Sequence, residues 1–241
     1  MADARKHNRD YYDEFSHWYE KERHDGYHAL IDDLESDLLM DYVKGKRVLE
    51  VGCGTGLIMH RIEETARHRV GLDISAGMLR RAVERGLDVV QGDATALPFD
   101  DNTFDVVYSF KVLAHVQDID QALREMVRVT KRGGVLLLEF YNRYSLRYLA
   151  KRVGGPQKIS DQTHEGVVFT RWDTPLDLVR RLPENVTVVD WAGVRVLTPF
   201  ARAHKVPIVK DVLSRAEFRA RDSLLKYFGG FLVVILEKEL A

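Results

Sequence analysis

The stretch that most restricts the fold of this 241-residue chain is RVLEVGCGTG, residues 47–56. Its first five residues have the short, mainly apolar character of a buried strand, and three glycines follow at every second position. A strand that passes through a glycine turn into a helix exposes backbone N–H groups and the positive end of the helix dipole. Anions and polar tails bind at such turns. The stretch therefore predicts a nucleotide-like ligand on an α/β fold.

The rest of the chain alternates short apolar runs with amphipathic stretches. Besides 47–51, strands are predicted at 69–75, 88–93, 104–110, 135–142, 186–197 and 229–238. Helices are predicted at 57–68, 76–86, 118–134, 145–153, 174–182 and 210–228. Continuous apolar strands that alternate with helices indicate a parallel sheet covered on both faces. We expect a single seven-stranded sheet.

The whole chain, residues 1–241, is predicted to be one domain. Residues 9–44 are expected to form an N-terminal helical layer, and residues 45–142 the ligand-binding core. The C-terminal third departs from the strand–helix rhythm. Segments 143–172 and 198–226 are therefore predicted to be insertions that act as a lid or cap.

Composition and charge exclude several classes of function. The formal net charge is −1, so no global field points to nucleic acid or to an acidic membrane surface. The longest apolar runs are strand-sized and too short to span a membrane, and the N-terminus is too polar for a secretory signal. The one cysteine, Cys53, excludes an internal disulfide and any paired-cysteine metal or redox site. We expect a cytoplasmic chain without a metal and without a nucleic-acid or membrane partner.

The spacing of the glycines separates two kinds of nucleotide site. Dinucleotide-binding turns read GxGxxG, whereas Gly52, Gly54 and Gly56 give GxGxG. The spacing of the third glycine governs whether a pyrophosphate fits between strand and helix. Glu50 precedes the turn, and a carboxylate there would repel a phosphate but suits a cationic group such as an ammonium.

Four ordered motifs carry a family resemblance: VLEVGCGTG, VGLDIS, GDATALPFDDNTFDVVYSF and LREMVRVTKRGGVLLLE. Over residues 47–140 the chain resembles the class I S-adenosylmethionine-dependent methyltransferases. It is most similar to the small-molecule group that includes the ubiquinone and menaquinone biosynthesis enzymes. The resemblance implies a Rossmann-like, mostly parallel seven-stranded sheet with helices on both faces and an antiparallel last strand.

The resemblance also implies S-adenosylmethionine as cofactor and a role for each matching position. Gly52, Gly54 and Gly56 would lie against its methionine part, and Glu50 would face the amino end. Asp73 would accept hydrogen bonds from both ribose hydroxyls, because one carboxylate offers two oxygens. Asp93 and the N–H of Ala94 would contact the adenine, and Ile74 and Met78 would pack against the adenosine. Phe110 and Lys111 would lie on the sulfonium side of the cofactor.

Two residues are candidates for catalysis. His115 follows the fourth strand, and its ordinary pKa near 6.5 suits a general base, although a structural histidine is the alternative. Tyr19 lies in the N-terminal layer with Arg23, Tyr27 and His28, and a tyrosine there often closes the pocket in resembling proteins.

Two further sets of residues are candidates for contact with the methyl acceptor. Tyr141, Asn142 and Arg143 end the fifth strand, where they would contact substrate or simply terminate the strand. Arg143, Arg147 and Lys151 share a helix face, which we interpret as solvated rather than anion-binding. Cys53 is expected to fill space in the glycine turn without a catalytic role.

The sequence thus predicts methyl transfer to an O or N nucleophile of a small molecule by in-line displacement, by a monomer or homodimer. Three alternatives remain open: a peptide or protein N-methyltransferase, a nicotinamide-dependent oxidoreductase, and a cofactor-binding protein without catalysis. Nucleic-acid methylation is disfavoured, because the chain has no basic excess and FYNRYS after the fifth strand is not the D/N-PP-Y/F motif.

Overall fold

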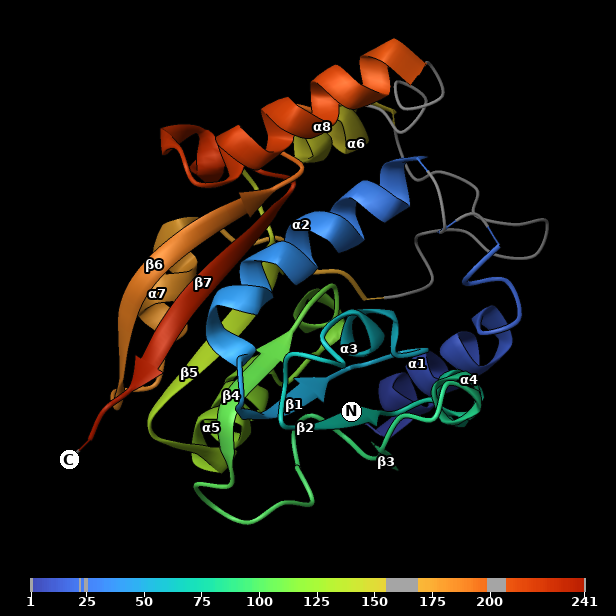
Figure 1. The fold of residues 1–241 in the computed structure, drawn as a ribbon, viewed down its shortest axis with the longest axis vertical. Helices are drawn as coiled ribbons and strands as arrows, with labels where there is room; N and C mark the ends of the chain where they lie inside the picture. The colour runs from blue at the N-terminus through green and yellow to red at the C-terminus, as the bar shows by residue number, and fades with distance from the viewer. Residues whose placement is uncertain (1, 22, 24–25, 155–168, 199–206, 241) are drawn as a thin grey trace.

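The computed structural model describes residues 2–21, 23, 26–154, 169–198 and 207–240. One seven-stranded sheet organises them, in the order β3-β2-β1-β4-β5-β7-β6 (Figure 1). Its strands are β1 Arg47–Val51, β2 His68–Asp73, β3 Val89–Gln91, β4 Phe104–Ser109, β5 Thr130–Tyr141, β6 Val186–Val194 and β7 Phe231–Lys238.

Strand direction agrees with the predicted architecture. The pairs β1–β2, β2–β3, β1–β4 and β4–β5 are parallel, whereas β7 is antiparallel to both β5 and β6. Only the last strand in sequence is therefore reversed, which confirms the prediction. The strand order turns back between β1 and β4, and ligands of open α/β sheets bind at the carboxyl ends of the strands at such a point. The glycine turn follows β1 at this position.

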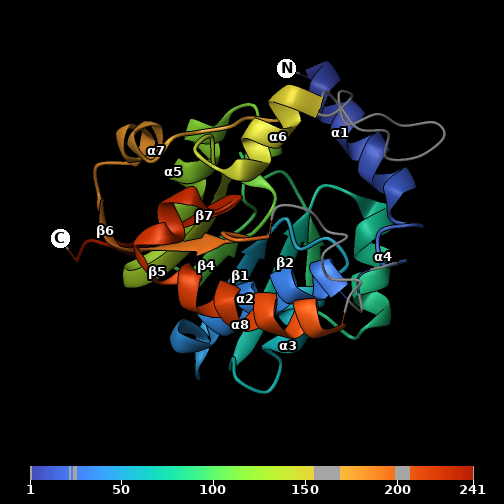
Figure 2. The same cartoon turned by 90° about the horizontal axis from the view of Figure 1, so that it is seen from above.

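Helices cover both faces of the sheet (Figure 2). They are α1 Ala2–Phe15, α2 Gly26–Val43, α3 Leu57–Arg61, α4 Ala76–Glu84, α5 Ile119–Val129, α6 Leu146–Gly154, α7 Pro175–Arg181 and α8 Pro207–Arg221. One buried apolar cluster joins α5 and α7 to one face, and a second joins α2 and α3 to the other. Side chains of β7 belong alternately to one cluster and to the other, because this strand is buried on both faces of the sheet.

Two predicted helices are shorter in the structure. The helix predicted at 118–134 ends at Val129, and Gly133 and Gly134 lie inside β5. Gly133 has a φ of +68°, and the β4–β5 register shifts there, so these glycines form an irregularity in the strand rather than a helix end. The helix predicted at 57–68 ends at Arg61, because the chain turns back to pair Ala66 with Lys44.

The two predicted insertions differ in what they cover. Segment 143–173 leaves the end of β5 and returns to it, since Arg143 N–H donates to the Asp173 carbonyl and Asp173 N–H to the Tyr141 carbonyl, both over 2.9 Å. Helix α8 lies against α2, where Arg221 contacts Leu34 and Asp37. A lid role for either segment stays a prediction, and residues 155–168 and 199–206 lie outside the described part. Among the described helices none is long and apolar enough to cross a membrane.

Candidate functional site

The glycine turn after β1 is tied to the end of the neighbouring strand β2. The backbone N–H of Gly54 donates to Oδ2 of Asp73 over 2.8 Å, and the N–H of Ser75 donates to Oδ1 over 2.9 Å. Burial raises the pKa of Asp73, although these two N–H groups oppose the shift. Each carboxylate oxygen keeps a second lone-pair direction for another donor. Asp73 is thus a double acceptor set directly beside the turn.

The glycines of the turn face different surroundings. A Cβ added to Gly52 would lie 2.2 Å from the Val112 side chain, so packing within the protein already demands glycine there. A Cβ added to Gly54 would meet nothing within 4 Å. Gly54, with a φ of +55°, therefore presents bare backbone to open space next to Asp73. A Cβ at Gly56 would meet the Leu87 side chain.

The other predicted adenosine contacts lie nearby with varied exposure. Met78 is only 2 % exposed in the first turns of α4, whereas Ile74 and Ala94 are half-buried. Asp93 Oδ1 accepts from both the N–H and the hydroxyl of Thr95 at 2.8 Å, which stabilises a local turn. Its adenine role remains a prediction.

Glu50 is more deeply buried than a simple ammonium ligand would be. Its side chain lies beneath the glycine turn, is 4 % exposed and accepts the Tyr108 hydroxyl at 2.9 Å. Burial raises the pKa of Glu50 to about 8, with the Tyr108 hydrogen bond and Lys111 acting in the opposite direction. Without a cationic ligand the side chain is therefore mainly protonated at neutral pH.

A buried charge layer supports this part of the site. Lys111, which follows β4 with a φ of +62°, pairs with Asp32 at 2.9 Å and Glu35 at 2.7 Å from α2. Glu139 accepts the backbone N–H of Lys111, and its pKa is raised well above the ordinary value by burial and by Glu35. Phe110, predicted beside the sulfonium, is buried against Tyr108. Sequence reasoning missed this layer because its acids lie far apart along the chain.

Helix α1 packs on the start of α4, beside the end of β2. Asp13 accepts the Ser75 hydroxyl at 2.6 Å and the Gly77 N–H at 2.8 Å, which fixes α1 on the start of α4. Tyr12 then lies near Asp73 and has its ring 6.4 Å from that of His115. Tyr12 and Asp13 were not predicted as site residues. Their only sequence signal is the aromatic run YYDEF in a polar segment.

The predicted N-terminal cluster is only partly assembled at the site. Tyr19 packs under the Arg23 guanidinium at 4.5 Å, and burial raises its pKa. Arg23 also pairs with Asp32 at 2.6 Å, which places it in the buried charge layer. Tyr27 instead lies under Arg195 at 4.7 Å, and His28 is exposed.

The hydrogen bonds of His115 favour one tautomer of its imidazole. Its Nδ1 lies 2.9 Å from the Phe169 carbonyl, which can only accept, so Nδ1 carries the proton. Its Nε2 lies 3.3 Å from the Tyr141 hydroxyl and presents a lone pair. Burial lowers the pKa of His115, and Arg147 and Lys151 add to this. The imidazole is therefore neutral at neutral pH, as a general base must be.

Aromatic rings extend from His115 toward the insertion. The Tyr141 ring lies 5.4 Å from His115, 5.2 Å from Trp172 and 5.1 Å from Phe231. The Arg147 guanidinium lies over Tyr141 at 4.4 Å, so this residue is not on a solvated face as the sequence suggested. The other two members differ, because Arg143 is exposed and Lys151 lies 5.7 Å from the Trp172 ring.

Several singled-out residues lie elsewhere or serve structure. The Cys53 thiol is buried, and burial raises its pKa well above the ordinary value, which makes it unreactive. Asn142 is buried and donates to the Tyr227 and Gly229 carbonyls, so it ends the strand.

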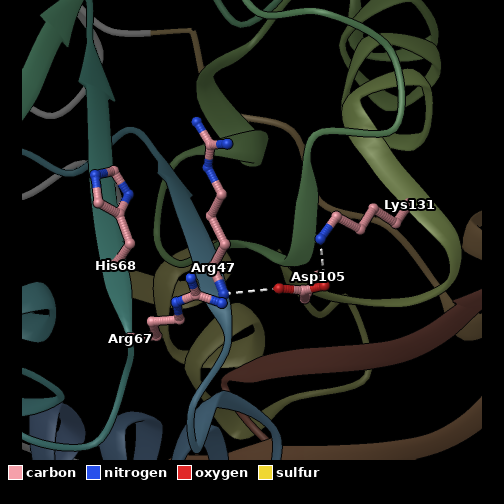
Figure 3. A pocket seen from close by; sticks show the side chains of 5 residues that line it. All are labelled: Arg47, Arg67, His68, Asp105 and Lys131. Atoms are coloured by element: carbon pink, nitrogen blue, oxygen red, sulfur yellow. Dashed lines mark hydrogen bonds and ion pairs between the residues drawn. The ribbon is translucent and has the colours of Figure 1, made fainter.

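A separate pocket opens at the amino ends of the strands, opposite the end that carries the glycine turn (Figure 3). Its lining residues come from the amino ends of the strands and the turn before β2, and they are Arg47, Arg67, His68, Asp105 and Lys131. Asp105 accepts the Arg47 N–H at 2.8 Å and pairs with Lys131 at 2.7 Å. None of the predicted site residues lies there. Within the described ranges no group of three or more metal-ligating side chains is assembled.

A glycine turn at the switch point and an acid at the end of the next strand define a class of α/β proteins that bind adenosine-type cofactors. Comparison with known proteins specifies the class. The sequence model of the methyltransferase domain matches residues 49–138. The demethylmenaquinone methyltransferase of Corynebacterium efficiens is 36 % identical over 163 residues, which are 61 % of this chain and 69 % of that one.

A second relative, from Thermobifida fusca, bears the same name. It is 37 % identical over 127 residues, half of this chain and 54 % of that protein. Among solved structures, a Thermotoga maritima S-adenosylmethionine-dependent methyltransferase, described as a possible histamine N-methyltransferase, superposes with a TM-score of 0.68. The two are 19 % identical over 95 % of this chain and 98 % of that one, which shows a shared fold.

The chain belongs to the class I S-adenosylmethionine-dependent methyltransferases, and within them it is similar to the demethylmenaquinone methyltransferases. Its cofactor is S-adenosylmethionine, as the resemblance implied. The site fits this cofactor, because Asp73 offers two acceptors for the ribose hydroxyls and Gly54 offers open backbone beside them. The family is thus confirmed, while the individual residue roles remain predictions.

Proposed function

We propose that this enzyme transfers the methyl group of S-adenosylmethionine to an O or N nucleophile of a small aromatic molecule of the quinone type. The observation that carries the proposal is the Asp73–Gly54 pair, with open space at Gly54. Tyr12 connects this pair to a neutral His115. Tyr12 would thus lie between the cofactor site at Asp73 and the base His115.

The cofactor supplies an activated methyl group when it is bound, so the chain has to bind, orient and exclude water. Asp73 would fix the ribose and Gly54 would admit the methionine part. Tyr12 and Tyr19 would close the N-terminal side. The acceptor would then meet the methyl group in line with its leaving sulfur, and orientation of this kind contributes about 7–11 kcal/mol in well-oriented model reactions.

The acceptor class follows from the wall beyond His115. The rings of Tyr141 and Trp172 are half-buried and lie 5.2 Å apart, and a neighbouring aromatic acceptor ring could pack against them. Relatives at 30–37 % identity are named for demethylmenaquinone, a ring of that kind. Both observations support a quinone-type acceptor over a peptide.

The proposal is tested by ligand stabilisation and by an acceptor assay. S-adenosylmethionine and S-adenosylhomocysteine at about 100 times their dissociation constants should each add about 2.7 kcal/mol to the free energy of unfolding. NADH should add nothing. Transfer of labelled methyl to a reduced demethylated quinone, but not to peptide amines, would support the assignment. Stabilisation by NADH alone would contradict it in favour of an oxidoreductase. Cofactor binding without transfer to any acceptor would favour a non-catalytic binding protein.

We propose His115 as the general base and Nε2 as the atom that receives the acceptor proton. The Phe169 carbonyl orients the ring through Nδ1, which directs the Nε2 lone pair toward the Tyr141 hydroxyl. An acceptor hydroxyl would either replace that tyrosine contact or pass its proton through it. Both routes place the proton on Nε2.

A His115→Gln variant separates basicity from structure. Glutamine can donate to the Phe169 carbonyl and accept from Tyr141, but it cannot take up a proton near neutral pH. We expect kcat to fall about 100-fold or more. The decline of the wild-type rate below pH 6.5, where the imidazole becomes protonated, should disappear. The measurement is the pH profile of kcat, with Tyr141→Phe as a companion variant. An unchanged rate and profile would leave His115 a structural residue.

A further inference from the structure

One cationic side chain near His115 has a hydrogen-bond donor that the protein does not use. Arg147 lies on α6, and its guanidinium is enclosed by rings at 4.4 Å (Tyr141), 4.5 Å (Phe231) and 5.3 Å (Trp172). Its Nη1 is buried and has no hydrogen-bond partner. Among the described residues, no carboxylate forms an ion pair with Arg147.

Aromatic faces do not satisfy this group. A ring beneath a guanidinium attracts its charge and contributes about 0.5–2 kcal/mol. The N–H groups, however, point outward in the plane of the guanidinium, and a buried donor without an acceptor is costly. The rings therefore hold the guanidinium in place, and its buried Nη1 is left without an acceptor. Such an arrangement suits a planar oxygen acid from outside the chain.

The surroundings of Arg147 are positive rather than neutral. Arg195 lies close by, since a Cβ added to Gly230 would be 3.1 Å from the Arg195 side chain and 3.5 Å from that of Arg147. Glu217 acts on the charge of Arg195 and accepts the backbone N–H groups of Val196, Leu197 and Thr198. Lys151 lies on the same helix as Arg147, over the Trp172 ring at 5.7 Å. The acids on α2, Asp32 and Glu35, are paired with Lys111.

We propose that the methyl acceptor carries a carboxylate, which Arg147 binds at Nη1 while the acceptor ring lies against Tyr141 and Trp172. This inference rests on the proposed function, because it concerns the acceptor of the same site. It adds to the small aromatic acceptor of that proposal one requirement, an acidic substituent on the ring. The bound carboxylate would also offset the positive charge that Arg147 directs at His115.

The test compares acids with their amides in direct binding. The protein is loaded with S-adenosylhomocysteine, and hydroxybenzoates and hydroxynaphthoates are titrated calorimetrically, each beside its primary amide. We expect at least one acid to bind the wild type ten times or more tightly than its amide. Arg147→Met, which keeps an apolar stem, should reduce that preference below twofold. Arg147→Lys keeps the charge but lacks the planar fork, and should show an intermediate preference.

Arg143→Met is the matched control, because it removes an exposed positive charge from the same insertion. It should bind like the wild type. Equal binding of every acid and amide by the wild type overturns the proposal, as does a preference that persists in Arg147→Met. If Arg147→Met does not fold, an undiminished preference in Arg147→Lys overturns it instead. Failure of the proposed function appears separately, as absence of stabilisation by S-adenosylhomocysteine.

Discussion

Replacement of Asp73 by alanine is expected to weaken S-adenosylmethionine binding by about 100-fold or more. The proposed ribose contacts are two hydrogen bonds to a charged acceptor, each contributing about 1.5–3 kcal/mol. Since 1.4 kcal/mol corresponds to a factor of ten, the loss of both exceeds two orders of magnitude. The substitution also releases the Gly54 and Ser75 N–H groups, which loosens the turn itself. Calorimetric titration with the cofactor measures the effect.

Asp105→Ala provides the matched control for this variant. Asp105 likewise accepts a backbone N–H, that of Arg47, and it lies near the amino end of β4, away from the glycine turn. Its removal should lower the melting temperature through the lost hydrogen bond and the lost Lys131 pair, yet leave cofactor affinity unchanged. Equal cofactor affinities of Asp73→Ala and the wild type would refute the ribose role.

Replacement of Glu50 by glutamine is expected to change stability and cofactor binding in opposite directions. The pKa of Glu50 is about 8 in the folded protein, against an ordinary value of 4.5. Between these values the folded state holds a proton that the unfolded state has released. The free energy of unfolding therefore falls as pH rises from 4.5 to 8, by about 1.4 kcal/mol for each unit of difference between the two pKa values.

Glutamine removes this titration and still accepts the Tyr108 hydroxyl. The variant should match the wild type near pH 4.5 and be more stable than it at pH 8.5, by several kcal/mol at most. It should also bind S-adenosylmethionine at least tenfold more weakly at pH 8, because a carboxylate beside the ammonium is lost. Denaturant unfolding across pH and cofactor titration measure the two effects.

Glu139→Gln serves as the control for burial alone. Glu139 is equally buried with a raised pKa, but its bond is to the Lys111 N–H rather than to the glycine turn. It should share the gain in stability at high pH without the loss of cofactor affinity. Identical pH profiles of stability in Glu50→Gln and the wild type would show that Glu50 is ionised in the folded protein.

Sequence patterns predicted the sheet well because its information is local. Each strand is a run of apolar residues, and helix α7, within the predicted range 174–182, begins after the Thr174 cap with Pro175 at its first position. The end of the helix before β5 was wrong, because paired glycines usually stop a helix and here they accommodate an irregularity against β4. That role depends on a neighbouring strand, which no local pattern reveals.

The site was predictable where one motif supplies it and less so where tertiary contacts do. Gly54 was singled out by the glycine spacing and Asp73 by the family resemblance, and the two are joined in the structure. Tyr12 and Arg147 reach the site only through the docking of α1 on α4 and the packing of α6 on aromatic rings. The position of Glu50 before the glycine turn is a local feature of the sequence, whereas its burial and its bond to Tyr108 depend on the register between β1 and β4.

Backbone contacts at the end of β5 close the segment between Asn142 and Asp173 into a unit attached to the domain. Asn142 and Asp173 form a bridge at which the segment leaves and re-enters the domain. Both ends of the segment are therefore fixed at the end of β5, although Phe169 and Arg171 between them also contact His115 and Ala114. If the segment selects the acceptor, as we propose for Arg147, donor chemistry and acceptor choice are encoded in different stretches of the gene. Exchange of residues 144–172 between related enzymes would carry substrate preference from one to another while leaving the methyl donor the same.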